Sequence, residues 1–453
     1  MSLATEVDKL TPTFIGQMLR PSDPGYDEAR RVHNGLIDKR PALIARCQGA
    51  ADVADAVKLA RALGLEVAVR GGGHNVAGRA AIDGGLMIDL APMKGIHVDP
   101  RARTARCQGG VLWKEYNRET QLHGLATTGG VVGTTGVAGL TLGGGLGWLM
   151  PKHGLALDNL RSVEIVLADG SLRRASADEH ADLFWAVRGG GGNFGVVTSF
   201  EFDAHPVGPM IAGGLVVHPL QRGSDALRFF REQCAAAPDE LMLAGGLLTA
   251  PDGSGAKLVG FLGAHCGPLA TGEAALKPIK AFGPPVMDQM GPISYCAQNS
   301  LLDASLPRGA LNYWKSHFLT DLSDGAIDAL VKSFEACPSP MSQIVIEHFH
   351  GAASRVPVDA TACAMRLTGF NVVIVSQWAD PRDTERCIAW CRETYGAIRP
   401  YLGSFRYVNY LDTDETGDPL AAAYGPNYAR LRQLKKKYDP ENFFRGNVNI
   451  KPS

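Results

Sequence analysis

Three glycine clusters carry the clearest chemical signal in this sequence. The first, residues 71–73, stands directly before His74, the second spans 143–147 and the third spans 189–195. Successive glycines can turn a row of backbone N–H groups toward one point, and such a row suits a diphosphate group. One cluster alone could equally be a set of tight turns. Three together predict a cofactor that carries phosphate.

The order of elements around the third cluster excludes one class of cofactor site. Residues 190–195 match the spacing GxGxxG, but a dinucleotide-binding fingerprint needs a strand before the glycines and a helix after them. Here a predicted helix (180–187) precedes the glycines and a predicted strand (194–202) follows them. We therefore do not expect a Rossmann-type NAD site.

Composition places the chain among ordinary globular proteins. It has 453 residues, enough for two or three domains, with 45% hydrophobic and 20% charged residues. The formal net charge is −1 and no basic block occurs, so nucleic acid and anionic membranes are not expected partners. We expect a small-molecule substrate, and a monomer or homodimer.

Nine scattered cysteines, with no paired CxxC, fit neither a disulfide framework nor a zinc ribbon. Cys387 and Cys391 share one face of a predicted helix, but no histidine joins them, and no metal site is expected.

The N-terminal residues MSLATEVDKL are charged where a signal peptide is apolar, and no apolar run of 18 residues occurs. We expect a cytoplasmic protein.

Hydrophobic patterning indicates an α+β protein. The first 200 residues alternate short strands and helices, beginning with a strand at 42–47, a helix at 50–64 and a strand at 66–70. After Pro206 the pattern changes to long apolar strands separated by helices, which predicts an antiparallel sheet with helices on one face. The predicted strands are 211–218, 240–249, 257–265, 343–350 and 370–378, and the helices lie near 224–237, 324–336 and 382–398. The last part holds a predicted strand at 404–412 and a helix at 427–438.

Four motifs together resemble one family. They are VRGGGHNVAG (69–78), TTGVAGLTLGGGLGWLMPKHGLALDNL (134–160), DLFWAVRGGGGNFGVVT (182–198) and KKYDPENFFRGNVNI (436–450). In this order they are similar to the vanillyl-alcohol-oxidase and berberine-bridge-enzyme-like flavoproteins. The resemblance implies a PCMH-type FAD-binding domain in two pieces, 1–206 and 404–453, around a substrate-binding domain at 207–403.

The resemblance also implies how FAD is held. His74 matches the histidine that the family bonds to the flavin 8α-methyl group. Many relatives add a cysteinyl bond, but residues 127–142 contain no cysteine and Val132 stands at that place, so a single covalent link is expected. The remaining expected cofactor contacts are Arg70, Gly71, Gly72, Gly73, Asn75, Gly78, Thr134, Thr135, Gly136, Val137, Gly139, Leu140, Gly143, Gly144, Gly145, Gly147, Trp148, Gly192, Asn193, Gly195, Val196, Val197, Asn447 and Asn449.

The same resemblance suggests catalytic residues. A tyrosine in a YxNY segment is the base in relatives, which indicates Tyr410, and its phenol near pKa 10 would need a cation such as Arg355 to lower that pKa. His348 and His350 are alternatives, because two-residue alternation places them on one strand face; that face could instead be buried against helices. Tyr410 could likewise be an aromatic core residue.

Val137 matches a gate position that leaves O₂ a path in relatives, although core packing would also explain it. The resulting hypothesis is an FAD oxidase that acts on an alcohol, an amine or a hydroxylated ring and releases H₂O₂. An FAD-linked oxidative cyclase or dehydrogenase of natural-product metabolism would use the same sites. A flavin-binding protein without turnover is a third hypothesis, and anaerobic addition of substrate would distinguish it because the flavin would not bleach.

Overall fold

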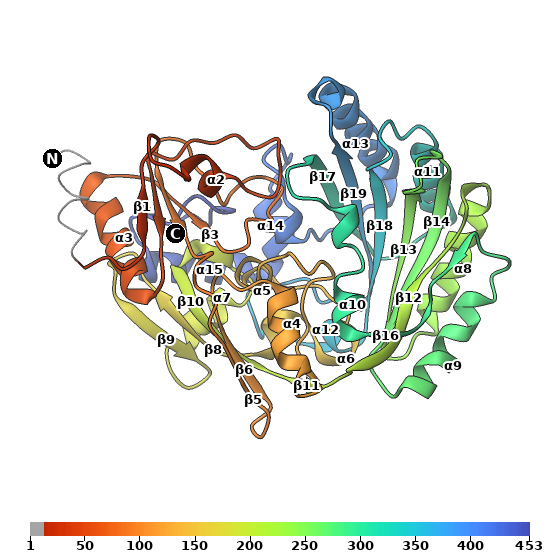
Figure 1. Cartoon of the computed structure of the whole chain (residues 1–453), viewed down its shortest axis with the longest axis horizontal. Coiled ribbons are helices and arrows are strands. Elements are labelled where there is room, and N and C mark those ends of the chain that lie inside the picture. The colour runs from red at the N-terminus through yellow and green to blue at the C-terminus, as the bar shows by residue number, and fades with distance from the viewer. Residues whose placement is uncertain (1–12) are drawn as a thin grey trace.

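A computed structural model of the chain describes residues 13–453. Residues 1–12, which the sequence argument used against a signal peptide and assigned to the FAD-binding domain, lie outside the described residues. The described part divides into small sheets at one end and one large sheet at the other (Figure 1). The predicted α+β class is confirmed.

Two small sheets form the N-terminal half. The first sheet has the order β1 (Gln17–Leu19), β2 (Leu43–Arg46), β4 (Leu86–Asp89) and β3 (Val67–Arg70). In it β2, β4 and β3 run parallel, because helix α3 (Ala50–Leu63) forms the crossover connection between β2 and β3. The second is antiparallel, with order β5 (Ile96–Asp99), β6 (Thr104–Gln108), β10 (Val196–Asp203), β8 (Leu160–Val166) and β9 (Leu172–Ser176).

Short elements join these sheets and carry the motif loops. A two-stranded pair, β7 (Leu125–Ala126) and β11 (His205–Pro206), closes this half before the large sheet begins. The helices are α2 (Tyr26–Arg30), α4 (Trp113–Gln121), α5 (Val137–Leu142), α6 (Met150–His153), η1 (Ala156–Asn159), α7 (Ala181–Val187) and η2 (Gly191–Asn193).

The large sheet has eight strands, and its neighbours are antiparallel. Its order is β15 (Met287–Asp288), β12 (Met210–Pro219), β14 (Lys257–His265), β13 (Leu241–Thr249), β18 (Gln343–Phe349), β19 (Gly369–Trp378) and β17 (Leu311–Leu319), with β16 (Gly291–Ser294) also paired to β12. β17 was not predicted from the sequence; it pairs with β19 and carries Trp314, which lines the cavity described below.

Long helices cover the outer face of this sheet (Figure 1). They are α8 (Gly223–Ala235), α9 (Leu269–Lys280), α11 (Asp324–Glu335) and α13 (Thr384–Ile398). Their apolar stripes pack on side chains such as Ile344 and Ile346 of β18 to form one core. The opposite face of the sheet therefore turns toward the N-terminal half.

The predicted strand at 404–412 is wrong, because this segment forms a 3₁₀ turn, η7 (Val408–Tyr410). Tyr407 and Tyr410 lie three residues apart, and their rings meet edge to face at 4.9 Å. Side chains three apart share one side of a 3₁₀ turn, whereas strand residues share a side at a spacing of two. Both tyrosines therefore point the same way.

The remaining short elements surround the large sheet or complete the C-terminal part. They are η3 (Leu220–Arg222), α10 (Tyr295–Asn299), η4 (Asp303–Ser305), α12 (Ala352–Arg355), η5 (Pro381–Asp383), η6 (Arg399–Tyr401), α14 (Pro419–Tyr424), η8 (Gly425–Asn427) and α15 (Tyr428–Tyr438).

An ion cluster ties the C-terminal segment to the large sheet. Lys315 of β17 is almost fully buried and pairs with Asp414 and with Glu415, the latter at 3.0 Å. Arg392 of α13 also reaches Asp414, at 2.8 Å, and Arg406 pairs with Glu415. The segment that carries Tyr407 and Tyr410 is thus fixed on both of its sides.

Candidate active site

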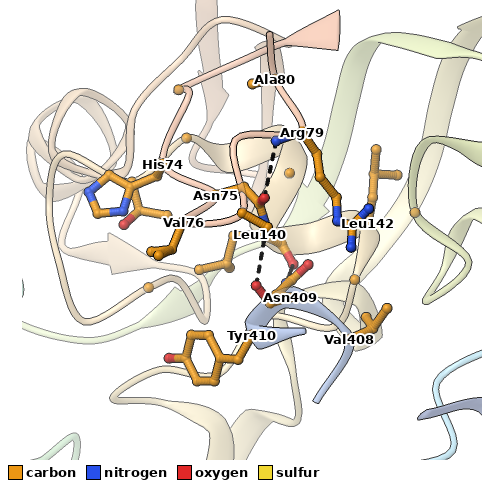
Figure 2. Close-up of a pocket in the computed structure, with 18 of the residues that line it drawn as sticks. His74, Asn75, Val76, Arg79, Ala80, Leu140, Leu142, Val408, Asn409 and Tyr410 are labelled. Atoms are coloured by element: carbon orange, nitrogen blue, oxygen red, sulfur yellow. Dashed lines mark hydrogen bonds between the residues drawn. The ribbon is translucent and has the colours of Figure 1, made fainter. Parts of the chain in front are cut away.

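A cavity lies between the glycine-rich loops and the inner face of the large sheet (Figure 2). It brings together segments from all four sequence motifs. Eighteen of the expected residues line it: Gly71, Gly72, Gly73, His74, Asn75, Val132, Thr135, Gly136, Gly139, Leu140, Gly143, Gly192, Asn193, Gly195, Val196, Val197, Asn447 and Tyr410.

Several glycines are required because backbone segments approach each other closely. A Cβ atom on Gly72 would lie 2.4 Å from the backbone nitrogen of Gly136, which excludes any larger residue. A Cβ on Gly143 would lie 2.0 Å from the amide oxygen of Asn409. The glycine loops therefore serve close packing as well as leaving backbone open to a ligand.

His74 stands at one end of the cavity (Figure 2). Its Nε2 atom is 3.2 Å from the hydroxyl oxygen of Thr134, and the ring of His33 stacks on it with centroids 3.8 Å apart. Desolvation, with a smaller contribution from His33, lowers the pKa of His74 to about 3. The imidazole is therefore neutral at physiological pH.

Arg79 was not predicted from the sequence, yet it fits a cofactor with phosphate. Its guanidinium group lines the cavity and donates to the backbone oxygens of Asp412 and Asn447 at 3.3 and 3.2 Å. Its Nε atom is buried without a partner, as is the hydroxyl group of Tyr424 beside the same cavity. Within residues 13–453 no carboxylate forms an ion pair with Arg79, so a bound anion would complement its charge.

A buried acid on β18 is the second residue that sequence reasoning missed. Glu347 lines the cavity; its carboxylate accepts a hydrogen bond from Asn371 Nδ2 at 2.6 Å, and Tyr410 is its other side-chain partner. Desolvation raises the pKa of Glu347 to about 7, against the two hydrogen bonds that lower it. A carboxyl group with a pKa near neutrality is suited to accept and return protons.

Tyr410 has the opposite protonation behaviour from the one expected. Burial, followed by the neighbouring Glu347, holds the pKa of its phenol well above 10. The phenol is therefore protonated at neutral pH and serves as a hydrogen-bond donor to Glu347. Glu347 directly precedes His348 on β18, and its side chain lies on the opposite face of the strand, the face that lines the cavity.

The inner face of three strands forms the wall opposite the glycine loops. In the cross-strand rows, Trp314 and Gln343 each pair with Val375, and Val345 pairs with Val373. Leu302, Leu306, Val131 and Val132 extend this surface around the cavity. Among the described residues, the strands of this wall contribute mostly apolar and aromatic side chains and one acid, Glu347, while Asp412 lines the cavity from the C-terminal segment.

Arg355, His348 and His350 do not line the cavity, which corrects the expectation for all three. Arg355 is exposed and its guanidinium group binds the carboxylate of Asp239, with Nη1 at 3.1 Å. His348, on the face of β18 that turns toward the helices, stacks at 4.1 Å on His350, which directly follows the strand. Alternation correctly placed them with Ile344 and Ile346, but that face is the covered one.

Nine expected cofactor contacts also lie behind the cavity wall: Arg70, Gly78, Thr134, Val137, Gly144, Gly145, Gly147, Trp148 and Asn449. Arg70 anchors the first glycine loop through Asp89, with Nε–Oδ1 at 2.8 Å. Gly145 donates its backbone N–H to the hydroxyl oxygen of Tyr407 at 2.9 Å. These residues shape the loops instead of facing the cavity.

Val137 is fully buried in the core at the start of α5, whereas its neighbours Thr135, Gly136 and Ala138 line the cavity. A gate for O₂ at Val137 is therefore not supported.

Within residues 13–453, no cluster of three or more His, Cys, Asp or Glu side chains is arranged to bind a metal ion. No helix in this part of the chain has the length and apolarity needed to cross a membrane.

Comparisons with known proteins agree with this geometry. Residues 41–176 match the family model described as an FAD binding domain, and residues 406–451 match the model described as berberine and berberine like. The chain is 31% identical to (R)-6-hydroxynicotine oxidase of Paenarthrobacter nicotinovorans, over 98% of each protein. It is 30% identical to an FAD-linked oxidoreductase of Dictyostelium discoideum, over 98% of this chain and 97% of that one.

Solved structures extend the match to the whole fold. The crystal structure of 6-hydroxy-D-nicotine oxidase from Arthrobacter nicotinovorans superposes with a TM-score of 0.88 at 30% identity, covering 97% of this chain and 99% of that one. Glucooligosaccharide oxidase of Acremonium strictum, described with a 6-S-cysteinyl, 8α-N1-histidyl FAD, gives 0.88 at 26% identity over 100% of both chains. The chain belongs to the berberine-bridge-enzyme-like family of FAD-linked oxidoreductases.

Proposed function

We propose that this protein is an FAD-dependent oxidase with a single covalent bond between His74 and the flavin, acting on a small organic substrate. The observation that carries the proposal is one continuous cavity that joins His74 to the buried pair Glu347–Tyr410. Bound FAD supplies a ring that accepts hydride at N5 and passes the electrons to O₂, giving H₂O₂. The protein supplies the proton acceptor and the apolar enclosure.

The surroundings of His74 support the covalent bond. Formation of the bond requires a neutral imidazole with one free nitrogen, and burial keeps this ring neutral. Thr134 Oγ1 is placed to accept a hydrogen bond from Nε2–H, which would leave the lone pair on Nδ1 free. Val132 carries no thiol where a relative bears a cysteinyl bond, so one bond is proposed instead of two.

The proposed domain boundaries coincide with the boundaries between the sheets. We assign 1–206 and 404–453 to the FAD-binding domain and 207–403 to the substrate-binding domain, as the sequence predicts. In support, every strand of the large sheet falls between Met210 and Trp378, and the smaller sheets end at Pro206. Tyr410 then comes from the C-terminal piece, and its ring meets Trp314 of the substrate-binding sheet.

Acid precipitation of the purified protein tests the covalent bond. We expect the yellow colour to stay with the pellet, and peptide mapping to find FAD on the His74 peptide and on no cysteine peptide. Colour that passes wholly into the supernatant, from protein that is active, contradicts the covalent bond. Rapid reoxidation of the reduced enzyme in air with stoichiometric H₂O₂ supports an oxidase, and slow reoxidation identifies a dehydrogenase instead.

A further inference from the structure

We propose that residues 300–308 form a lid over the cavity, and that Asp303 holds this lid closed through a hydrogen bond to the backbone of Gly133. The lid joins α10 to β17, and in Figure 1 this part of the chain lies at the boundary between the small sheets and the large sheet. The inference goes beyond the proposed function, because a lid admits and encloses any ligand of the cavity, whatever the chemistry of that ligand.

The lid has one side on the cavity and one side in solvent. Leu302 and Leu306 line the cavity, and Leu306 packs in one apolar cluster with Trp314 and Val373. Residues 304, 305, 307 and 308 are exposed. Because the same short segment carries both sides, a single layer of chain separates the cavity from solvent here.

The other walls of the cavity are held more firmly. The glycine loops pack backbone against backbone, as at Gly72 and Gly136. The strands of the large sheet are covered by helices on their outer face, and the segment with Tyr410 is fixed by the ion cluster around Lys315. A path for ligand through these walls would disrupt a sheet or a close packing, whereas the lid can move at the cost of a few hydrogen bonds.

Both ends of the lid are anchored. Before it, the Asn299 side chain donates a hydrogen bond to the backbone oxygen of Gly130 at 2.6 Å. After it, the N–H of Gly309 donates to the backbone oxygen of His33 at 2.9 Å. Gly309 has a φ of +90°, which favours glycine, and a Cβ atom there would meet nothing within 4 Å. The chain therefore has room to pivot at Gly309 while the flanking segments stay fixed.

One side chain fastens the middle of the lid to the glycine loops. Asp303 Oδ1 accepts a hydrogen bond from the backbone N–H of Gly133 at 2.7 Å. Among the described residues, no other hydrogen bond joins residues 300–306 to the half of the molecule that carries the glycine loops. The contact is close, because a Cβ atom on Gly133 would lie 2.8 Å from Ser300 Oγ.

The lid can open as one body once this bond breaks. Within it, Ser305 N–H donates to the backbone oxygen of Leu302 at 3.1 Å, which keeps the 3₁₀ turn η4 intact. On the side of the large sheet, the Gln377 side chain reaches the backbone oxygen of Ser305 only at 3.3 Å. A carboxylate acceptor makes a stronger hydrogen bond than a neutral one, so Asp303 makes the strongest of these contacts.

The accessibility of an introduced thiol measures opening without any substrate. Val373→Cys places a thiol on the cavity wall beneath Leu306, at a position that is 3% exposed. Holoenzyme is mixed with methyl methanethiosulfonate, and mass spectrometry follows the tryptic peptide 367–382, which contains no native cysteine. Adding Asp303→Ala should speed labelling about tenfold or more, because it removes a hydrogen bond to a charged group.

Two matched variants separate the lid from a general effect. Asp303→Asn keeps an amide oxygen that can accept the same bond, so its labelling rate should stay within about threefold of the parent protein. Asp321→Ala, which removes an exposed acid just after β17, should leave the rate unchanged. Equal rates with and without Asp303→Ala, or rapid labelling while Asp303 is intact, would overturn the proposal.

Hydrogen exchange tests the same motion with Val373 in place. In holoenzyme, the backbone amides of residues 301–306 should exchange about tenfold or more faster in Asp303→Ala than in wild type, whereas the amides of β19 should not change. Faster exchange throughout β19 as well would show a loss of global stability instead of lid opening, and it would contradict the proposal. Neither measurement requires turnover or a known substrate.

Discussion

Replacement of Glu347 by glutamine should make the protein more stable above neutral pH while removing the proton acceptor. The pKa of this fully buried carboxyl group is raised from 4.5 in the unfolded chain to about 7 in the folded protein. Between these values the folded state keeps a proton that the unfolded state has lost, so stability falls as pH rises. At about 1.36 kcal/mol per pH unit, the loss amounts to about 3 kcal/mol by pH 7.

Glutamine keeps the shape and cannot ionise, so the variant should escape this loss. The free energy of unfolding, measured with urea on holoenzyme at pH 4.5, 6 and 8, should show the two proteins diverging by about 3 kcal/mol across that range. Glu232→Gln serves as the control, since an exposed carboxyl group has little to gain. Parallel pH curves for wild type and Glu347→Gln would refute the reasoning that Glu347 is desolvated and without a cation.

Three further predictions concern the other parts of the site. Tyr410→Phe removes a hydrogen bond to a charged group, worth about 1.5–3 kcal/mol, so anaerobic flavin reduction should slow roughly 10- to 150-fold while flavin content persists; a rate within twofold of wild type contradicts the contact with Glu347. Thr134→Val should lower the fraction of FAD that stays in the acid pellet, and His74→Ala should reduce it to zero; retained colour in the alanine variant would move the bond elsewhere. Lys315→Met removes the buried cation that Asp414 and Glu415 share, leaving them only Arg392 and Arg406, and should lower the free energy of unfolding by about 2 kcal/mol at pH 7. The ion pair holds the pKa of Asp414 well below its ordinary value, so this stabilisation is present above about pH 4 and is lost as pH falls further; equal urea midpoints for variant and wild type at pH 7 would contradict it.

The cofactor side of the site could be predicted because its signals are local. Glycines 71–73 and the following His74 depend on backbone conformation within one turn, and the structure places them together on the cavity. The long strands were predictable for the same reason, since alternation over a few residues defines them. By contrast, Arg79 follows only five residues after His74, and its role emerges only because distant backbone oxygens of Asp412 and Asn447 hold it there.

Which residues of the large sheet line the cavity could not be predicted from the sequence, because tertiary packing decides it. Alternation along β18 separates Gln343, Val345 and Glu347 from Ile344 and His348, but it does not state which set is covered by helices. That choice is made by the packing of α8 and α11 on one face, which buries the histidines and turns the acid toward the cavity. The sequence by itself determined the fold class and indicated FAD as the cofactor, because those follow from short-range pattern and backbone chemistry. Only the tertiary structure decided that Glu347 lines the cavity with a raised pKa, since that pKa and its partner Tyr410 arise from burial between segments far apart in the chain.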